Sequence, residues 1–510
     1  MGKIVSKKEY KTEIRPSLKT ENKTVALCHG VFDLVHPGHI IHFEQAKGMA
    51  DVLVVSITAA RYVRKGPGRP YFDDEMRLKF LSTIDYIDYV LLSEGYTVDD
   101  IIEAVEPDVY VKGNEYADES ADITKKIRAE RELVEMHGGR IQFTGGQVFS
   151  STKLINTAMS GLPEEVRHYM EDFSMRHTME EIMGYVQKAE NLKVLVVGDV
   201  IVDRYTYCNV QGLMSKDMGY SARLKSTEEY LGGAVAVARH LAEFSDEVTL
   251  MSIIGCEKQM RLKLFDEVSD CIQLKLIYSS EFPTIVKHRY ITRNAKREEY
   301  QKLFAITNIP DKMQFDDKAM NKFKEKLREK IESYDVVFLC DFGNGLVDSE
   351  TMDIIQKGAK YLVLNCQTNS SNYGLNIITK YKRADVFVLD QGELKLAYPG
   401  LMGNEDEALR KLSKHLGGRG WLTKGSLGAQ GIEDNEIERC PAFTLTVKDT
   451  IGAGDAFFSM AGIFSAAGVP MEVGTFMGNI GGALGANIIG NKEAVEKVNV
   501  LKYADTLMNV

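Results

Sequence analysis

Short apolar runs alternate with amphipathic stretches along most of the chain. In the first part of the sequence, each apolar run is followed by a segment with the periodicity of a helix. Strands separated by helices at this spacing form parallel sheets with helices on both faces. We therefore predict an α/β domain whose strands are Thr24–His29, Val52–Ile57, Tyr89–Leu92, Val109–Lys112 and Arg140–Phe143.

A second α/β series follows after a change of pattern. Between about Asn156 and Asn191 the sequence is charged, favours helices and has no strand signal. The organisation predicted is a mobile polar tail (1–23), a first domain (24–158), a helical connector (159–192) and a larger second domain (193–510). The strands predicted in the second domain are Lys193–Asp199, Val248–Ile254, Val336–Asp341, Tyr361–Leu364, Val386–Leu389 and Trp421–Lys424.

Composition narrows the class of protein. With 510 residues, 44% hydrophobic and 27% charged, the chain is that of a folded protein with two or three domains. A net charge of −10 gives no broad field for nucleic acid or an anionic membrane. The seven cysteines form no C-x-x-C pair, which favours a reducing cytoplasm over a disulfide framework. No apolar stretch follows the N-terminal charges, and the uncharged segment Val473–Asn491 reads as a buried helix, so neither a secretory signal nor a membrane span is expected.

Two histidines mark the passage from the first predicted strand into a helix. His36 and His39 bracket Pro37 and Gly38, so both imidazoles can face one anion at a helix N-terminus. Loops at the carboxyl ends of parallel strands are where α/β proteins bind ligands. From the spacing alone, two other interpretations stay open: the histidines are a solvent-exposed polar pair, or they are two metal ligands on one helical turn.

The same segment resembles the nucleotidyltransferase superfamily, whose signature is G-x-F-D-x-x-H-x-G-H. The resemblance implies that His36 and His39 are catalytic, that Lys65 and Arg69 clamp the phosphates, and that Mg²⁺ bridges them. A solvated basic loop is the open alternative for Lys65 and Arg69. The positions implied to bind nucleotide or phosphate are Gly30, Phe32, Asp33, Gly38, Lys65, Arg69, Lys112, Ser151 and Thr152.

A second candidate site lies near the other end of the chain. Gly452, Ala453 and Gly454 precede a helix that carries Asp455. Small residues let the backbone approach a phosphate, and a helix N-terminus supplies N–H donors for the charge that develops in phosphoryl transfer. A carboxylate at that place can accept the proton of an attacking sugar hydroxyl. Glycines before helices are common, so these four residues alone do not establish a site.

The longer string D-T-x-G-A-G-D-x-F resembles the ribokinase-like (PfkB) sugar kinases, over residues 193–510. The resemblance implies Asp455 as the catalytic base, Glu393 as a magnesium residue and Tyr205–Leu231 as a β lid through which two chains pair. It implies nucleotide binding by Thr450, Gly452, Ala453, Gly454, Lys424, Gly425, Gly428 and Asn479. It implies substrate binding by Asp199, Asp203, Gly232, Gly233, Lys287 and Arg289.

The two sites together resemble the bifunctional heptose 7-phosphate kinase and heptose 1-phosphate adenylyltransferase family, with the domains in reversed order. The resemblance implies a kinase that uses ATP on a sugar or sugar phosphate and a transferase that adds a nucleotidyl group, adenylyl first, to a sugar 1-phosphate. Ala236, Asn344 and Asn365-Cys366 depart from the kinase pattern, and Asn344 removes a lysine that would pair with a phosphate. A cytidylyltransferase that uses CTP, with a regulatory kinase-like domain, and a nucleotide-binding module without catalysis are the open alternatives.

Overall fold

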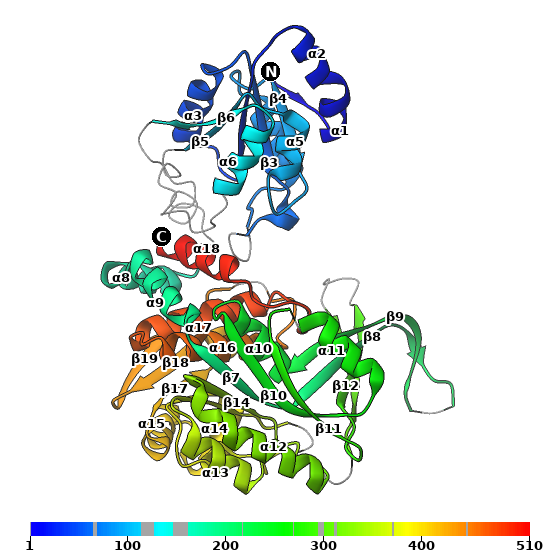
Figure 1. Ribbon diagram of the computed structural model, residues 1–510, viewed down its shortest axis with the longest axis vertical. Coiled ribbons are helices and arrows are strands. Elements are labelled where there is room, and N and C mark those ends of the chain that lie inside the picture. The colour runs from blue at the N-terminus through cyan, green and yellow to red at the C-terminus, as the bar shows by residue number, and fades with distance from the viewer. Residues whose placement is uncertain are drawn as a thin grey trace. The chain divides into compact units, whose positions relative to one another are not determined.

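The computed structural model describes most of the chain and divides it into two compact units. Unit 1 comprises Met1–Leu162 with Leu501–Val510, and unit 2 comprises Pro163–Val500 (Figure 1). The predicted site residues Lys65, Ser151 and Thr152 lie outside the described residues. The structure describes residues 2–64, 69–113, 127–145, 162–216, 218–268, 270–293, 300–310, 314–369, 372–444 and 447–509.

Unit 1 is built on a six-stranded parallel sheet in the order β1-β4-β3-β2-β5-β6. All five strands predicted for this part are present, and the α/β prediction is confirmed. The strand order reverses between β2 and β5, and the carboxyl ends of the two strands at such a reversal are the usual ligand position in α/β sheets. The strands are β1 (Lys3–Ile4), β2 (Val25–Gly30), β3 (Val52–Thr58), β4 (Tyr89–Ser93), β5 (Val109–Gly113) and β6 (Arg140–Thr144).

Helical segments connect the strands of unit 1. They are α1 (Lys7–Glu9), a π-helical turn (Tyr10–Ile14), α2 (Arg15–Thr20), α3 (Pro37–Lys47), α4 (Asp74–Ser82), α5 (Asp99–Val105) and α6 (Ile127–Met136).

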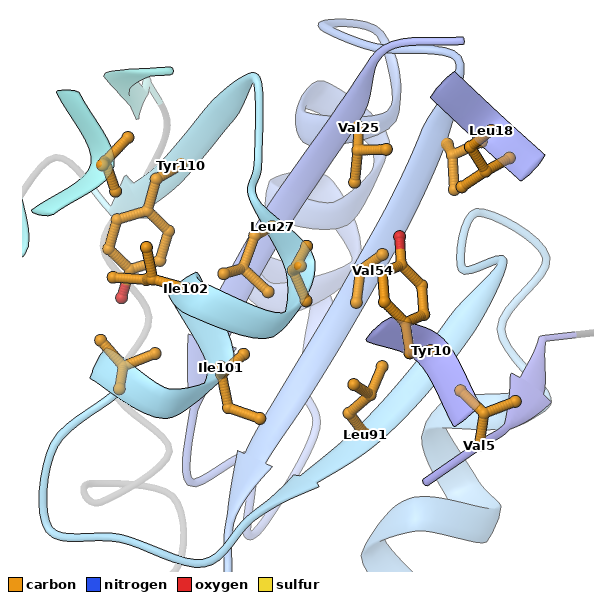
Figure 2. Packing of buried hydrophobic residues seen from close by; sticks show 14 residues of the cluster. Val5, Tyr10, Leu18, Val25, Leu27, Val54, Leu91, Ile101, Ile102 and Tyr110 are labelled. Carbon is orange, nitrogen blue, oxygen red and sulfur yellow. The ribbon is translucent and has the colours of Figure 1, made fainter. Parts of the chain in front are cut away.

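The first 23 residues are not the polar tail that their composition predicted. Strand β1 pairs with the edge strand β4, and Val5, Tyr10 and Leu18 are buried in the core of unit 1. Figure 2 shows their side chains directed toward Val54 and Leu91 of the sheet. Tyr10, Ile14 and Leu18 recur every four residues and so share one face of a helical segment. That sparse apolar stripe is the signal that the charged residues between them obscured.

Unit 2 contains a nine-stranded sheet in the order β11-β10-β7-β14-β15-β16-β17-β18-β19. Neighbouring strands from β11 to β17 are parallel, and β18 and β19 add an antiparallel hairpin. The order reverses between β7 and β14, which places a second ligand crevice there. The strands are β7 (Lys193–Gly198), β10 (Glu247–Gly255), β11 (Gln273–Ser279), β14 (Val336–Asp341), β15 (Leu362–Cys366), β16 (Val386–Asp390), β17 (Arg419–Thr423), β18 (Ala429–Glu433) and β19 (Glu436–Cys440).

A separate four-stranded sheet in the order β13-β12-β8-β9 forms the lid of unit 2. Its strands are β8 (Val200–Leu213), β9 (Tyr220–Gly233), β12 (Ile285–Arg293) and β13 (Tyr300–Asn308). The β8–β9 hairpin extends well beyond the nine-stranded sheet (Figure 1). The predicted lid segment lies within this hairpin.

The helices of unit 2 include the segment predicted as a connector. Helices α8 and α9 pack within unit 2, where the ring centroids of Phe173 and Phe476 are 4.4 Å apart and His177 Nε2 lies 3.0 Å from Glu472 Oε2. The connector is therefore part of the kinase-like unit from residue 163 onward. The helices are α8 (Glu164–Arg176), α9 (Met179–Glu190), α10 (Ala234–Ala242), α11 (Lys258–Val268), α12 (Asp317–Lys330), α13 (Ser349–Gly358), α14 (Gln391–Ala397), α15 (Glu405–Leu416), α16 (Ala453–Ala466) and α17 (Met471–Gly485). The last helix of the chain, α18 (Lys497–Met508), begins in unit 2 and belongs to unit 1 from Leu501 onward.

The uncharged segment near the C-terminus forms α17, whose side chains are mostly buried in unit 2. Within the described part of the chain, no helix combines the length and apolar character that crossing a bilayer requires.

Candidate active sites

The histidine pair of unit 1 lies at the N-terminus of α3, an 11-residue helix that follows β2. His36 occupies the N-cap position, and its main-chain N–H donates to His39 Nδ1 over 3.4 Å. The two rings stack with their centroids 3.8 Å apart. Burial lowers the pKa of His36, so its imidazole is neutral near pH 7. The structure thus brings both predicted catalytic histidines together at a helix N-terminus, with Gly38 in the first turn.

The Phe32 ring packs beside the histidine pair. Phe32 has a φ of 45°. Its ring centroid lies 5.2 Å from that of His39 and 5.1 Å from that of Phe43. A Cβ atom on Gly30 would lie only 3.1 Å from the Phe32 ring. Gly30 and Phe32, predicted to bind nucleotide, therefore act in this structure by setting the close approach of the loop to His39.

Asp33 has a different role from the predicted contact with phosphate. Its carboxylate accepts hydrogen bonds from the main-chain N–H groups of Tyr71 (2.9 Å) and Phe72 (3.0 Å). Arg69 Nη1 lies 3.3 Å from Asp33 Oδ2. A buried carboxylate repels a phosphate unless a cation intervenes. Asp33 therefore anchors the loop that carries Arg69, and of these two side chains Arg69 has the charge that can meet a phosphate.

Lys112 and Arg77 are the other cations near this crevice. Lys112 ends β5, beside β2, and its Nζ lies 2.8 Å from Glu130 Oε2 on α6. Arg77 is buried and donates to the carbonyl oxygens of Val31 (2.7 Å) and Thr58 (3.0 Å). Arg77 thus ties together the loops that follow β2 and β3, a structural role that no motif signalled.

The second candidate site is a cavity of about 190 Å³ in unit 2. It lies where the lid, the N-terminus of α16 and the loops after β14 and β15 meet. Its lining residues are Ile201, Asp203, Gly233, Lys287, Arg289, Phe342, Gln367, Ile451, Gly452, Gly454, Asp455 and Asn491. Seven of the predicted site residues are among them, from segments that are far apart in the sequence.

The glycine-rich turn places Asp455 in the first turn of α16. Gly452 caps this helix with a φ of +86°, and a Cβ atom there would lie 2.2 Å from Asn491 Oδ1. Glycine is therefore required at this position on both conformational and steric grounds. Burial raises the pKa of Asp455 to about 6. A carboxylate with that pKa is mostly ionised at neutral pH and is basic enough to accept a proton.

The opposite wall of the cavity comes from the lid and carries one carboxylate and two cations. Asp203 of β8 forms an ion pair with Arg289 of β12, and Asn491 Nδ2 donates to Asp203 Oδ2 over 3.4 Å. Lys287 lies on the same strand as Arg289, with its Nζ 6.0 Å from the Phe342 ring centroid. Burial lowers the pKa of Lys287, which shows that the cation sits away from bulk water.

The di-glycine element lets the lid strand approach these groups. A Cβ atom on Gly232 would lie 2.4 Å from Asp203 Oδ2. Gly233 has a φ of +60°, and its Cβ would lie 2.5 Å from the carbonyl oxygen of Asp199. Both predicted glycines therefore act by permitting close packing, and Gly233 also lines the cavity.

Asp199 lies at the crevice between β7 and β14 but is not among the described residues that line the cavity. Its Oδ2 accepts a hydrogen bond from Asn344 Nδ2 over 3.1 Å. Burial, with the charge of Asp341, raises the pKa of Asp199 to about 7. Asp341 is neutralised by Lys380, whose Nζ lies 2.5 Å from its Oδ2. Asn344, the residue that replaces the expected lysine, thus serves as the partner of a buried carboxylate.

The residues near β17 to β19 that were predicted to bind the nucleotide stabilise the turn between β17 and β18 and contact the end of β19. Lys424 Nζ lies 2.9 Å from Glu405 Oε2. Gly425 has a φ of +58°, and a Cβ atom on Gly428 would lie 2.1 Å from the carbonyl oxygen of Cys440. Asn479 Nδ2 donates to that same oxygen over 3.2 Å. The amide of Asn479 is therefore engaged by the main chain in this structure, where the resemblance implied a nucleotide base.

Glu393 does not offer a free carboxylate to a metal ion. Its two oxygens accept hydrogen bonds from the main-chain N–H groups of Thr368 and Asp390, each over 3.0 Å. Burial raises the pKa of Glu393 to about 7. Among the residues that the structure describes, no cluster of three or more His, Cys, Asp or Glu could hold a metal. Mg²⁺ usually keeps several waters and binds through substrate phosphates, so these residues fit an ion that enters with ATP better than a caged one.

Two features were missed by sequence reasoning. Gln367 and Asn491 both line the cavity, and each hydrogen-bonds one of its carboxylates, Asp455 and Asp203 respectively. They lie 88 and 288 residues from these partners in the chain, so no local pattern could signal the contacts.

The second unit thus has the architecture of an α/β phosphotransferase: a parallel sheet, a β lid, and an aspartate in the first turn of a glycine-led helix. Residues 191–467, more than half of the chain, match the family model for pfkB family carbohydrate kinases. The chain belongs to the pfkB family of carbohydrate kinases. Residues 27–159 match a second family model, described as cytidylyltransferase-like.

Known proteins with similar sequences match part of the chain. Bifunctional protein HldE of Citrifermentans bemidjiense is 36% identical over 146 residues, 28% of this chain and 28% of that protein. HldE of Trichlorobacter lovleyi is 31% identical over 166 residues, 32% of each. The chain thus spans about a third or less of the length of these relatives. A crystal structure of Escherichia coli phosphofructokinase-2 in complex with substrates and products has a TM-score of 0.49 and 13% identity, covering 62% of this chain and 99% of that one.

Proposed function

We propose that unit 2 transfers the terminal phosphoryl group of ATP to a hydroxyl of a sugar or sugar phosphate resembling heptose 7-phosphate. Unit 1 then transfers a nucleotidyl group, adenylyl in the first instance, to a sugar 1-phosphate and releases pyrophosphate. The product is a nucleotide sugar. The transferase precedes the kinase in the chain, the reverse of the order in the bifunctional heptose family. Membership of the carbohydrate kinase family and the cytidylyltransferase-like match support the pair of activities.

In the kinase step, Asp455 accepts the proton of the attacking hydroxyl. The hydroxyl oxygen bonds to the terminal phosphorus, the bond from that phosphorus to the bridging oxygen breaks, and ADP leaves. The N–H groups at the start of α16 stabilise the charge on the transferred group. Lys287 adds a positive charge on the lid side of the same cavity. Mg²⁺, when bound with ATP, neutralises charge on the phosphates.

In the transferase step, the imidazoles of His36 and His39 donate hydrogen bonds to the α-phosphate of the nucleotide. The sugar 1-phosphate oxygen attacks that phosphorus, and the bond to the leaving pyrophosphate breaks. The reaction needs charge neutralisation and in-line positioning more than a covalent nucleophile. Arg69, on the loop that Asp33 anchors, supplies positive charge to the phosphates. Lys65, Ser151 and Thr152 stay predicted contacts.

The position of Asp455 in the cavity carries the kinase proposal. The test measures ADP formation and pyrophosphate release for the unmodified protein, Asp455→Asn and His39→Ala. General-base removal is expected to lower sugar-dependent ADP formation by about 10²–10⁴-fold in Asp455→Asn alone. When a sugar 1-phosphate is added directly, pyrophosphate release should fail in His39→Ala alone, so each variant is the folding control for the other. Full kinase activity in Asp455→Asn would remove the proposal.

A second candidate is a cytidylyltransferase for a polyol or sugar phosphate, with unit 2 as a regulatory domain. Asn344, in place of a lysine that pairs with phosphate, favours it, as does the cytidylyltransferase-like match. Pyrophosphate release with CTP but not ATP, together with no ADP formation on any sugar, would select this candidate.

We also propose that the chain acts as a homodimer in the cytoplasm. Leu213, Leu224 and Phe304 on the lid strands are 75%, 64% and 55% exposed, which supports pairing through the lid. All seven cysteines are free, as a reducing compartment requires. Light scattering should give twice 57.1 kDa, and a Leu213→Glu, Leu224→Glu variant should give a monomer. A monomeric unmodified protein would refute the dimer.

A further inference from the structure

Gln367 is held rigidly at the edge of the kinase cavity. It follows the carboxyl end of β15, where its main-chain N–H donates to the carbonyl oxygen of Asp341 over 2.8 Å. Its own carbonyl oxygen accepts a hydrogen bond from Asn376 Nδ2 over 3.0 Å. With the backbone fixed on both sides, the side chain has a set direction, and it lines the cavity.

That side chain contacts the group proposed as the general base. Gln367 Nε2 donates to Asp455 Oδ1 over 3.2 Å. Among the residues that the structure describes, Asp455 Oδ2 has no hydrogen-bond partner. The carboxamide of Gln367 donates a hydrogen bond to the carboxylate but does not itself accept a proton. It therefore orients Asp455 without competing for the proton of the substrate hydroxyl.

We propose that Gln367 is a positioning residue for Asp455: its amide holds Oδ1, so that Oδ2 is the oxygen presented to the hydroxyl of the substrate. The inference rests on the proposed kinase function of Asp455. It assigns to Gln367 a part in the proton transfer that the family signature, confined to residues 449–457, does not contain.

The charges around Asp455 determine what loss of this contact would do. Burial raises the pKa of Asp455 most, the hydrogen bond from Gln367 lowers it, Asp203 of β8 raises it, and Lys287 of β12 lowers it. The Glu393 carboxyl of α14 and the Cys340 thiol of β14 also interact electrostatically with Asp455. Without the amide of Gln367, one of the interactions that lower the pKa of Asp455 is lost, so the pKa rises. The base is then protonated over a wider range of acidic pH.

The test compares the full-length protein with Gln367→Met, which keeps the volume of the side chain, and Gln367→Glu, which keeps its shape. Carbon-13 NMR of protein labelled at the aspartate carboxyl carbons follows the titration of Asp455, and Asp455→Asn assigns its resonance. We expect the Asp455 midpoint to move to higher pH in both variants, further in Gln367→Glu, where two carboxylates share the site. This measurement needs no substrate, so it stands even if unit 2 proves not to be a kinase.

The kinetic measurement then tests the positioning role itself. A rise of one pKa unit lowers kcat about tenfold below the pKa of the base and leaves it unchanged well above. We therefore expect the acid limb of the kcat profile of Gln367→Met to move to higher pH with KM unchanged, and the plateau near pH 9 to stay below that of the unmodified protein because the base is no longer oriented. An unshifted Asp455 titration, or a plateau near pH 9 equal to that of the unmodified protein, would overturn the proposal. Absence of sugar-dependent ADP formation in the unmodified protein would instead overturn the proposed function.

Discussion

Replacing Asp199 by asparagine is expected to stabilise unit 2, and most strongly at alkaline pH. Asp199 is 3% exposed, and burial with the charge of Asp341 raises its pKa from 3.8 to about 7. In the unfolded chain the carboxyl has a pKa of about 3.9. The folded state therefore holds this proton more tightly than the unfolded state does. Stability is lost as pH rises from about 4 to about 7, and then levels off.

The magnitude follows from the difference between the two pKa values. About three units at 1.36 kcal/mol each amount to about 4 kcal/mol of destabilisation above pH 7, falling to near zero below pH 4. An asparagine at position 199 carries no charge to bury, and its carbonyl oxygen can still accept the hydrogen bond from Asn344. We expect Asp199→Asn to raise the free energy of unfolding by about 2–4 kcal/mol at pH 8 and to change it little at pH 4.

The chain offers its own probe for this assay. Trp421 is the single tryptophan, and it is buried in β17, so its fluorescence reports on the unfolding of unit 2. Urea unfolding would be followed at pH 4 and pH 8, with Asp266→Asn as the control because Asp266 is exposed on α11. A stabilisation that is equal at both pH values, or a loss of stability at pH 8, would refute the buried charge as the cause. A pH-dependent gain would show that Asp199 is kept at a price in stability, as residues of binding sites often are.

Three further outcomes are expected. Gly452→Ala should lower kinase activity and the unfolding midpoint reported by Trp421 more than Gly468→Ala does. Both glycines have φ near +85°, but only a Cβ atom at position 452 would contact another group. Equal effects of the two substitutions would show that this steric clash is not the cause. Arg77→Met should destabilise unit 1 by about 3–5 kcal/mol, seen as an earlier circular-dichroism melting transition, and an unchanged melt would contradict its bracing role. Because burial lowers the pKa of His36 from its ordinary value, pyrophosphate release should not fall as the pH rises from 7 to 8, whereas a steady fall with rising pH would indicate a protonated imidazole.

The parallel strands could be predicted because each is a short apolar run bounded by polar sequence. Val336–Asp341 was predicted with the bounds that β14 has. Strand β13 of the lid and the β18–β19 hairpin were not predicted as strands. Their sequences, such as YQKLFAITN for β13, mix charged and apolar residues, because one face of the lid meets solvent. The N-terminal segment was misjudged for the same reason.

The sites could be predicted only as far as they are local. The glycine-led helix with Asp455 and the histidine pair are continuous motifs, and the structure places each at a helix N-terminus. Asp33 belongs to the histidine motif and Asn479 lies on α17 after the glycine motif, yet both hydrogen-bond main-chain groups. A sequence motif identifies a residue but does not show which group its side chain hydrogen-bonds in the folded protein. The contact between Gln367 and Asp455 joins two loops that only the folded sheet brings together.

Phosphorus NMR of the protein with Mg·ATP and heptose 7-phosphate tests the central claim most directly. The account predicts a new anomeric phosphate resonance that grows with ADP in the unmodified protein and is absent in Asp455→Asn. With heptose 1-phosphate supplied in place of heptose 7-phosphate, it predicts pyrophosphate and a nucleotide sugar, both absent in His39→Ala. If ATP stays intact with heptose 7-phosphate and with a panel of other sugars and sugar phosphates, or if Asp455→Asn forms ADP as fast as the unmodified protein, the two-site account is contradicted.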